Sequence, residues 1–109
     1  MFAITSAPVT GPASSTADLG AITVQLQDLY GNPVDASASG TELVLASDSA
    51  GTTVFAETLA GTSVTSLTIP VGISSATFYY GDSQPGNPLI TVSGLLISAA
   101  QKETITAGP

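Results

Sequence analysis

The chain has 109 residues, with 43% hydrophobic and only 8% charged residues. That charged fraction is far below the roughly 25% of an ordinary soluble domain. One Lys, no Arg and eight carboxylates give a net charge of -7. Nucleic acid is therefore not expected as a partner, because almost no cations are available to neutralise phosphates. The absence of Cys and His removes disulfides, thiol nucleophiles and the commonest transition-metal ligand.

The length predicts a single domain spanning 1–109, with 1–21 as an edge strand and irregular lead-in and 107–109 as a stub of linker. No apolar run approaches the ~20 residues that a membrane-spanning helix needs, so we expect no membrane insertion. Met1-Phe2 does not resemble the start of a signal peptide. We interpret Met1 as an expression start on a domain taken from a longer protein.

Short segments of alternating apolar and polar residues predict strands along the whole chain. Turn residues separate these segments about every 8–12 residues, a spacing that is typical of a β-sandwich. In chain order, the predicted strands are 2–5, 22–28, 41–47, 53–56, 63–69, 75–80, 89–95 and 99–106, with an irregular Pro- and Gly-containing stretch at 6–20. The sequence predicts an all-β sandwich of seven to eight antiparallel strands. With an odd number of strands, the two termini would emerge at opposite ends.

The segment 22–34 runs from a half-buried strand into a dense cluster of turn residues. A carboxylate at the end of such a strand can accept backbone N–H groups across the turn. We therefore predict a structural turn formed by Asp28, Gly31, Asn32 and Pro33.

Calcium binding is the alternative role for the carboxylates that follow predicted strands. The ion takes six to eight oxygen ligands, and Asp28, Asp48 and Asp82, with Asp35, could supply some of them if their loops met. The chain has no dense D-x-D-x-D-G run, however. We favour the structural turn and expect no cofactor.

Catalysis has little support in the sequence. The eight carboxylates are scattered, so no pair is placed by a motif for acid–base work. The Ser and Thr hydroxyls lack the His or Cys that usually accompanies an activated nucleophile. We predict that the chain is not an enzyme.

The segment 25–34, QLQDLYGNPV, resembles bacterial immunoglobulin-like repeat domains of the invasin/intimin-like kind. Their second strand typically reads V-x-x-x-D-x-x-G-N-P-V. The resemblance continues in order through 64–70 (VTSLTIP), 75–82 (SATFYYGD), 90–95 (ITVSGL) and 99–101 (AAQ). It implies an immunoglobulin-like β-sandwich that serves as a spacer or as part of an adhesive surface. Some relatives carry a Cys in the region that corresponds to 52–61, where this chain has none.

Lys102 is the only cation, and it has two interpretations. Some immunoglobulin-like surface domains link a Lys amine to an Asn side chain near an acid. Asn32 or Asn87, with Glu103, would supply these groups here. The simpler interpretation, which we favour, is an exposed lysine that protects a sheet edge from aggregation.

The resemblance and composition together predict a non-enzymatic spacer or stalk module of a bacterial cell-surface or secreted protein. We expect an extracellular location, contacts with neighbouring domains of the same chain, and a monomer when the domain is isolated. The alternative is an adhesion or carbohydrate-binding module that uses the loops 48–53 and 81–88 to contact a glycan or host protein. Tyr79 could then stack on a sugar ring, although an outward Tyr is more often a cross-strand packing partner.

Overall fold

The computed structural model describes residues 2–28, 30–36, 40–94 and 98–107. The strands within these ranges are β1 (Phe2–Ile4), β2 (Thr10–Pro12), β3 (Leu19–Leu26), β4 (Thr41–Ser47), β5 (Thr53–Ala56), β6 (Ser63–Val64), β7 (Ser66–Ile69), β8 (Ser75–Asp82), β9 (Leu89–Ser93), β10 (Ala99–Lys102) and β11 (Thr104–Thr106). No helix capable of crossing a membrane occurs in these ranges.

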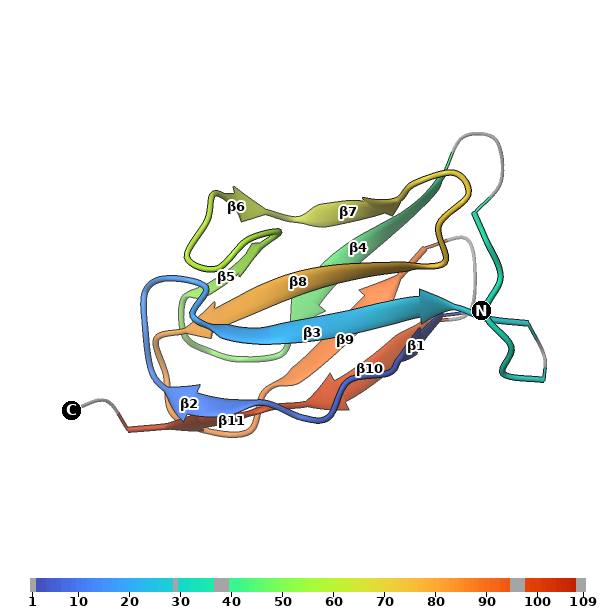
Figure 1. Cartoon of the computed structure of the whole chain (residues 1–109). Helices are drawn as coiled ribbons and strands as arrows, with labels where there is room; N and C mark the ends of the chain where they lie inside the picture. The colour runs from blue at the N-terminus through green and yellow to red at the C-terminus, as the bar shows by residue number, and fades with distance from the viewer. Residues whose placement is uncertain (1, 29, 37–39, 95–97, 108–109) are drawn as a thin grey trace.

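Two antiparallel sheets pack face to face (Figure 1). One has the strand order β1-β3-β8-β5-β6, and the other has the order β10-β9-β4-β7. A third, two-stranded sheet pairs β2 with β11 in parallel, with Thr10 opposite Thr104 and Pro12 opposite Thr106. The predicted class, an all-β immunoglobulin-like sandwich, is confirmed, although this one terminal pair is parallel rather than antiparallel.

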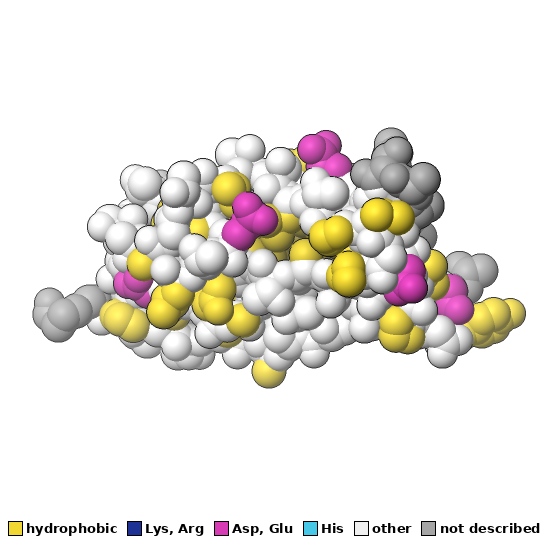
Figure 2. All heavy atoms as spheres, turned by 45° about the horizontal axis from the view of Figure 1, so that its top comes forward, with side chains coloured by type: hydrophobic (Ala, Val, Ile, Leu, Met, Phe, Trp, Pro, Cys, Tyr) yellow, Lys and Arg dark blue, Asp and Glu magenta, His cyan; other side chains and the backbone are white. Residues whose placement is uncertain are grey.

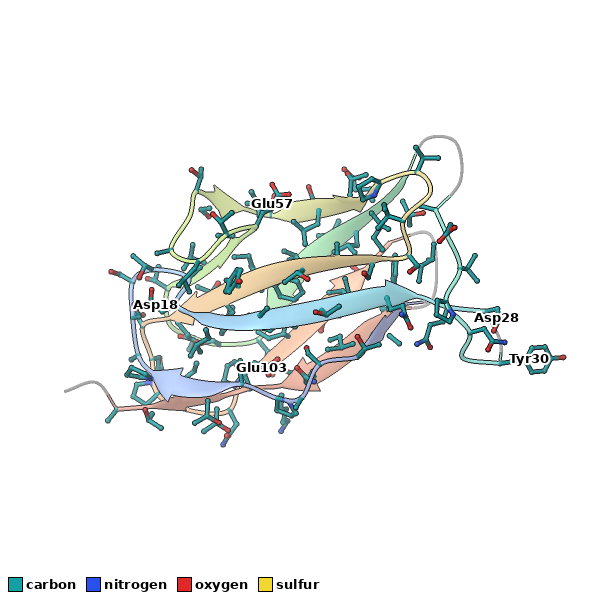
Figure 3. All side chains as sticks on the ribbon, in the orientation of Figure 1. Asp18, Asp28, Tyr30, Glu57 and Glu103 are labelled. Carbon is teal, nitrogen blue, oxygen red and sulfur yellow. The ribbon has the colours of Figure 1, made fainter. Side chains whose placement is uncertain are left out.

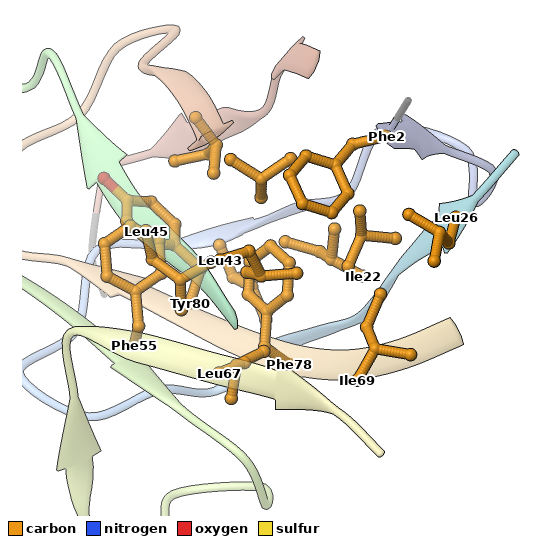
Figure 4. Packing of buried hydrophobic residues seen from close by; sticks show 14 of the residues in the cluster. Phe2, Ile22, Leu26, Leu43, Leu45, Phe55, Leu67, Ile69, Phe78 and Tyr80 are labelled. Carbon is orange, nitrogen blue, oxygen red and sulfur yellow. The ribbon is translucent and has the colours of Figure 1, made fainter. Parts of the chain in front are cut away.

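The core fills the space between the two sheets (Figure 4). The alternation along β3 has the predicted effect, because Ile22, Val24 and Leu26 are all buried. The ring of Phe55 lies 5.9 Å from that of Phe78 and 5.1 Å from that of Tyr80, measured between centroids. Such tilted and edge-on arrangements are favourable for aromatic pairs.

Two of the predicted strands each turn out to be shared between sheets. The predicted strand 63–69 breaks at Thr65, so that β6 pairs with β5 whereas β7 pairs with β4. The predicted strand 99–106 breaks at Glu103, so that β10 pairs with β9 and β11 pairs with β2. These breaks, together with β2, raise the number of strands in the described residues above the seven to eight predicted. Local alternation does not specify which sheet a segment joins.

The lead-in before β3 is more ordered than predicted. The stretch 6–20 contains β2, and β3 starts at Leu19 and ends at Leu26, rather than spanning 22–28. The lead-in passes close to β8, since the Ser14 amide donates to the Asp82 carbonyl at 2.8 Å. Gly81 permits this approach, because a Cβ at that position would lie 2.0 Å from the Thr16 carbonyl oxygen.

The strand ends lie at the two ends of an elongated molecule that measures 44 × 26 × 18 Å. β1 begins at one end and β11 finishes at the other (Figure 1), as the sequence predicted for the termini. Leu95 in the predicted strand 89–95, and 108–109 in the predicted linker stub, lie outside the described residues.

Candidate functional site

The two loops that the sequence singled out for recognition lie side by side at one end of the sandwich. The Thr52 amide donates to Ser83 Oγ at 2.8 Å, and the Ser83 amide donates to the Thr52 carbonyl at 3.0 Å. The Leu89 amide donates to Asp48 Oδ1 at 2.8 Å. These bonds tie the β4–β5 connection to the β8–β9 connection.

A shallow hollow of about 150 Å³ opens between these loops. Its lining residues are Asp48, Ser49, Ala50, Gln84, Pro85, Gly86, Asn87 and Pro88. Amides, hydroxyls and one carboxylate could form hydrogen bonds there, but the lining contains no aromatic ring and no cation. The hollow therefore lacks the aromatic platform on which a sugar ring would stack.

A buried hydrogen-bond network holds this end of the sandwich together. Asp82 is 1% exposed, and its Oδ2 accepts from the Tyr80 hydroxyl at 2.7 Å while its Oδ1 accepts from the Gln84 amide at 2.9 Å. The Tyr80 oxygen is also 2.7 Å from Ser47 Oγ, which accepts from the Ser49 amide at 3.2 Å. Burial raises the pKa of the Tyr80 hydroxyl, so this group stays protonated as a donor.

The direction of the network follows from these contacts. Because Tyr80 donates its proton to Asp82, it accepts from the Ser47 hydroxyl. The hydrogen bonds from Ser47 to Tyr80 and from Tyr80 to Asp82 thus connect the start of the loop after β4 with the start of the loop after β8. No pattern in the sequence indicates that the Tyr80 hydroxyl meets Asp82.

The four carboxylates considered for calcium, Asp28, Asp35, Asp48 and Asp82, are not arranged as a metal site in the described structure. β3 and β8 are antiparallel, so Asp28, just beyond β3, and Asp82, at the end of β8, lie at opposite ends of the molecule. Asp82 and Asp48 share an end, but both accept hydrogen bonds from the protein itself. Throughout the ranges that the structure describes, no group of three or more acidic side chains is arranged to hold a metal ion.

The Asp28 turn is organised by the carboxylate at its start (Figure 3). Asp28 Oδ1 accepts from the Tyr30 amide at 2.8 Å and from the Asn32 amide at 3.0 Å, and Oδ2 accepts from Asn32 Nδ2 at 3.3 Å. Gly31 has a φ of 81°, which glycine adopts without strain. The amides of Asn32 and Tyr30 lower the pKa of Asp28, so the carboxylate stays ionised.

Lys102 and Tyr79 lie in ordinary structural positions. Lys102 is exposed on β10, the outer strand of its sheet, and no ion pair or hydrogen bond joins it to Asn32, Asn87 or Glu103 in the described structure. Both Asn side chains bond elsewhere, Asn32 to Asp28 and Asn87 to Thr104. Tyr79 is half-buried, and its ring covers the backbone at Gly20 on β3.

Glu103 occupies a position that the sequence interpretation did not anticipate. We considered it as an acid beside Lys102, but Lys102 is exposed whereas Glu103 is completely buried. Its Oε1 accepts from the Val9 amide at 3.0 Å. Burial raises the pKa of Glu103, with the Val9 hydrogen bond acting in the opposite direction.

Comparison with known proteins identifies a shared fold. No protein-family model and no curated protein matches the sequence. Among solved structures, the chain is similar to "Crystal structure of the S-layer protein SbsC domains 4 and 5", with a TM-score of 0.63 and 20% identity. The match covers 98% of this chain and 51% of that one, so this chain spans about half the length of the solved structure.

We expect Tyr80→Phe to destabilise the protein by about 1–3 kcal/mol, because it leaves the buried Asp82 carboxylate without one of its donors. Urea unfolding at neutral pH measures the change. Tyr79→Phe is the matched control, since no hydrogen bond of its hydroxyl occurs in the described structure, and it should stay within about 0.5 kcal/mol of the parent. Equal effects of the two substitutions would show that the network does not stabilise this end.

We also expect Asp28→Ala to lower the thermal unfolding midpoint, because two backbone amides lose their acceptor. Asp35→Ala is the control: Asp35 is exposed and accepts no hydrogen bond in the described structure. The pKa of Asp28 is lowered in the folded state, so its stabilisation is present above the ordinary Asp range and is lost as pH falls. Midpoints that change alike for both variants at neutral pH would contradict this role.

Proposed function

We propose that this chain is a non-enzymatic spacer module of a bacterial cell-surface or secreted protein, of the invasin/intimin-like immunoglobulin-like kind. It holds neighbouring domains of its own chain apart and transmits tension between them. The fold shared with domains of an S-layer protein supports a structural role at a cell surface. The ordered resemblance of segments such as QLQDLYGNPV supports the finer family.

The charge of the surface suits a domain that does not associate with other copies of itself. On the face drawn in Figure 2, acidic side chains stand separately among uncharged groups. A net charge of -7 with one lysine disfavours association between copies by repulsion of like charges. We propose that the isolated domain is monomeric and that its contacts are made through its ends.

The observation that carries the proposal is the parallel pairing of β2 with β11 in a molecule whose ends lie apart. Neighbouring domains would apply force at the start of β1 and at the end of β11. The two paired strands are then pulled in opposite directions along their axes. Their hydrogen bonds are loaded in shear, so several must break together, whereas strands pulled apart from one end lose their bonds one at a time.

Hydrogen bonds on both sides of β11 resist this sliding. The Thr104 amide donates to the Val9 carbonyl, and the Ala13 amide donates to the Thr106 carbonyl, both at 2.9 Å. On the other side, Gly86 and Ile105 exchange two backbone hydrogen bonds of 2.9 and 2.8 Å. β11 is therefore anchored to the start of the chain and to the β8–β9 connection at once.

The loops 48–53 and 81–88 support a second candidate, recognition of a glycan or host protein. Their proximity and the hollow between them favour it. The lack of an aromatic ring in that lining makes a sugar-binding role less well supported than the spacer role.

Single-molecule pulling tests the spacer proposal. Tension applied through the two termini should require a higher unfolding force than tension applied between the C-terminus and a handle on Ser15→Cys, because the second geometry peels β2 from β11. Ser15 is exposed just after β2, and the chain has no other Cys, so the handle is unique. The same variant pulled through its termini controls for the substitution. Equal forces in both geometries would contradict the proposal.

A further inference from the structure

The side chains of Gln101 and Glu103 form hydrogen bonds with the backbone of the part of the lead-in that lies between β1 and β2. Gln101 Nε2 donates to the Ser6 carbonyl at 2.6 Å, and the Val9 amide donates to Glu103 Oε1 at 3.0 Å. The two side chains are two residues apart, so on an extended chain they lie on the same face. They form a clamp, which we define as Gln101 and Glu103 with the lead-in residues Ser6 and Val9.

The clamp contains two buried oxygen atoms that have no hydrogen-bond partner in the described structure, Gln101 Oε1 and Glu103 Oε2. Rotating the amide of Gln101 does not resolve this, because its oxygen would then face the Ser6 carbonyl oxygen. An ionised Glu103 cannot resolve it either, since both atoms would be acceptors. A buried acceptor without a partner is costly, and a buried charge more so.

We propose that Glu103 is a neutral carboxylic acid in the folded protein, whose Oε2–H donates to Gln101 Oε1 while its Oε1 accepts from the Val9 amide. One proton taken from solvent on folding then satisfies both oxygens, and the same proton is released on unfolding. Residues two apart on a strand are separated by about 6–7 Å, a span that these two long side chains can bridge.

The surroundings of Glu103 favour the neutral form. It is fully buried, and desolvation raises its pKa. The elements around it, which are the lead-in with β2 (5–13), β1, the segment 83–94 and β11, contain no titratable side chain. Lys102 is exposed, and Asp18, the next carboxylate along the lead-in, is exposed and bonded to Ser14 and Thr16. No neighbouring cation in the described structure thus offsets the charge that ionisation would create.

The pH dependence of stability follows from this arrangement. The folded pKa of Glu103 lies above its unfolded value, ordinarily about 4.3, so the folded state binds the proton more tightly. Its stabilisation is complete below that value and is lost as pH rises through the folded pKa. Asp18 and Asp28 act in a separate, acidic window: hydrogen bonds lower their pKa values, so their stabilisation is lost as pH falls.

Carboxyl-detected NMR of the unmodified protein is the first test. The chain has three glutamates, Glu42, Glu57 and Glu103, so their side-chain carboxyl signals can be assigned and titrated in one series. Glu103 should titrate at a clearly higher pH than the ordinary glutamate value of about 4.3. Titration of Glu103 within the ordinary glutamate range would overturn the proposal, since water would then be satisfying an ionised Glu103.

Glu103→Gln tests the consequence, because the amide keeps a donor and an acceptor where the acid has them. Between about pH 5 and about pH 8, the thermal midpoint of the parent should fall with rising pH, and this fall should be absent in Glu103→Gln. Glu42→Gln, altered at an exposed site, should keep the parental dependence. An unchanged dependence in Glu103→Gln would overturn the proposal. If that variant does not fold, the titration of the parent decides the question alone.

Discussion

The parallel pairing of β2 with β11 is the constraint on which this fold depends. β1 belongs to the five-stranded sheet and β10 to the four-stranded sheet, yet the segments next to them leave those sheets and pair with each other. The pair therefore joins the two sheets along one side of the sandwich. It also pairs a segment near the start of the sequence with one near its end. Forming a contact between such distant segments costs loop-closure entropy, which the packed core must offset.

Three carboxyl groups support this framework in different ways, and the environment of each explains why. Asp28 is ionised because backbone amides point at it from a partly exposed turn. Asp82 is buried, but the Tyr80 hydroxyl and the Gln84 amide donate hydrogen bonds to its carboxylate. Glu103 has only the Val9 amide and a desolvated setting, so a proton is the least costly way to complete its hydrogen bonds. In a chain with so few charges, each buried carboxyl group has a distinct structural effect.

Local pattern was sufficient for much of the fold but not for the connections between sheets. The alternation of apolar residues predicted β4 and β5 with their observed bounds, and the aromatic strand β8 to within two residues. The breaks at Thr65 and Glu103 depend on which neighbour is available in three dimensions, and a run of alternating residues contains no such information. β2 was missed because Gly11 and Pro12 have low strand propensity, and the segment pairs only with β11, which is far away in the sequence.

The burial of Glu103 could have been predicted from the two-residue alternation along the last predicted strand. Ile105 faces the core, and counting back by two places Glu103 and Gln101 on the same face. The charge of Glu103 obscures this signal, because glutamate is usually exposed. The hydroxyl partner of Asp82 had no comparable signal, because Tyr80 and Asp82 share a face without any pattern that requires their side chains to bond.

Native-state hydrogen exchange measures most directly whether the terminal pair is integral to the fold. The amides of Ala13 and Thr104 bridge β2 and β11, and the amide of Leu45, bonded to Thr65, reports on the interior. If the pair holds the sandwich closed, all three amides should exchange only through global unfolding, with the same dependence on denaturant. Rapid exchange of Ala13 and Thr104 by local opening, with Leu45 still protected, would contradict this account.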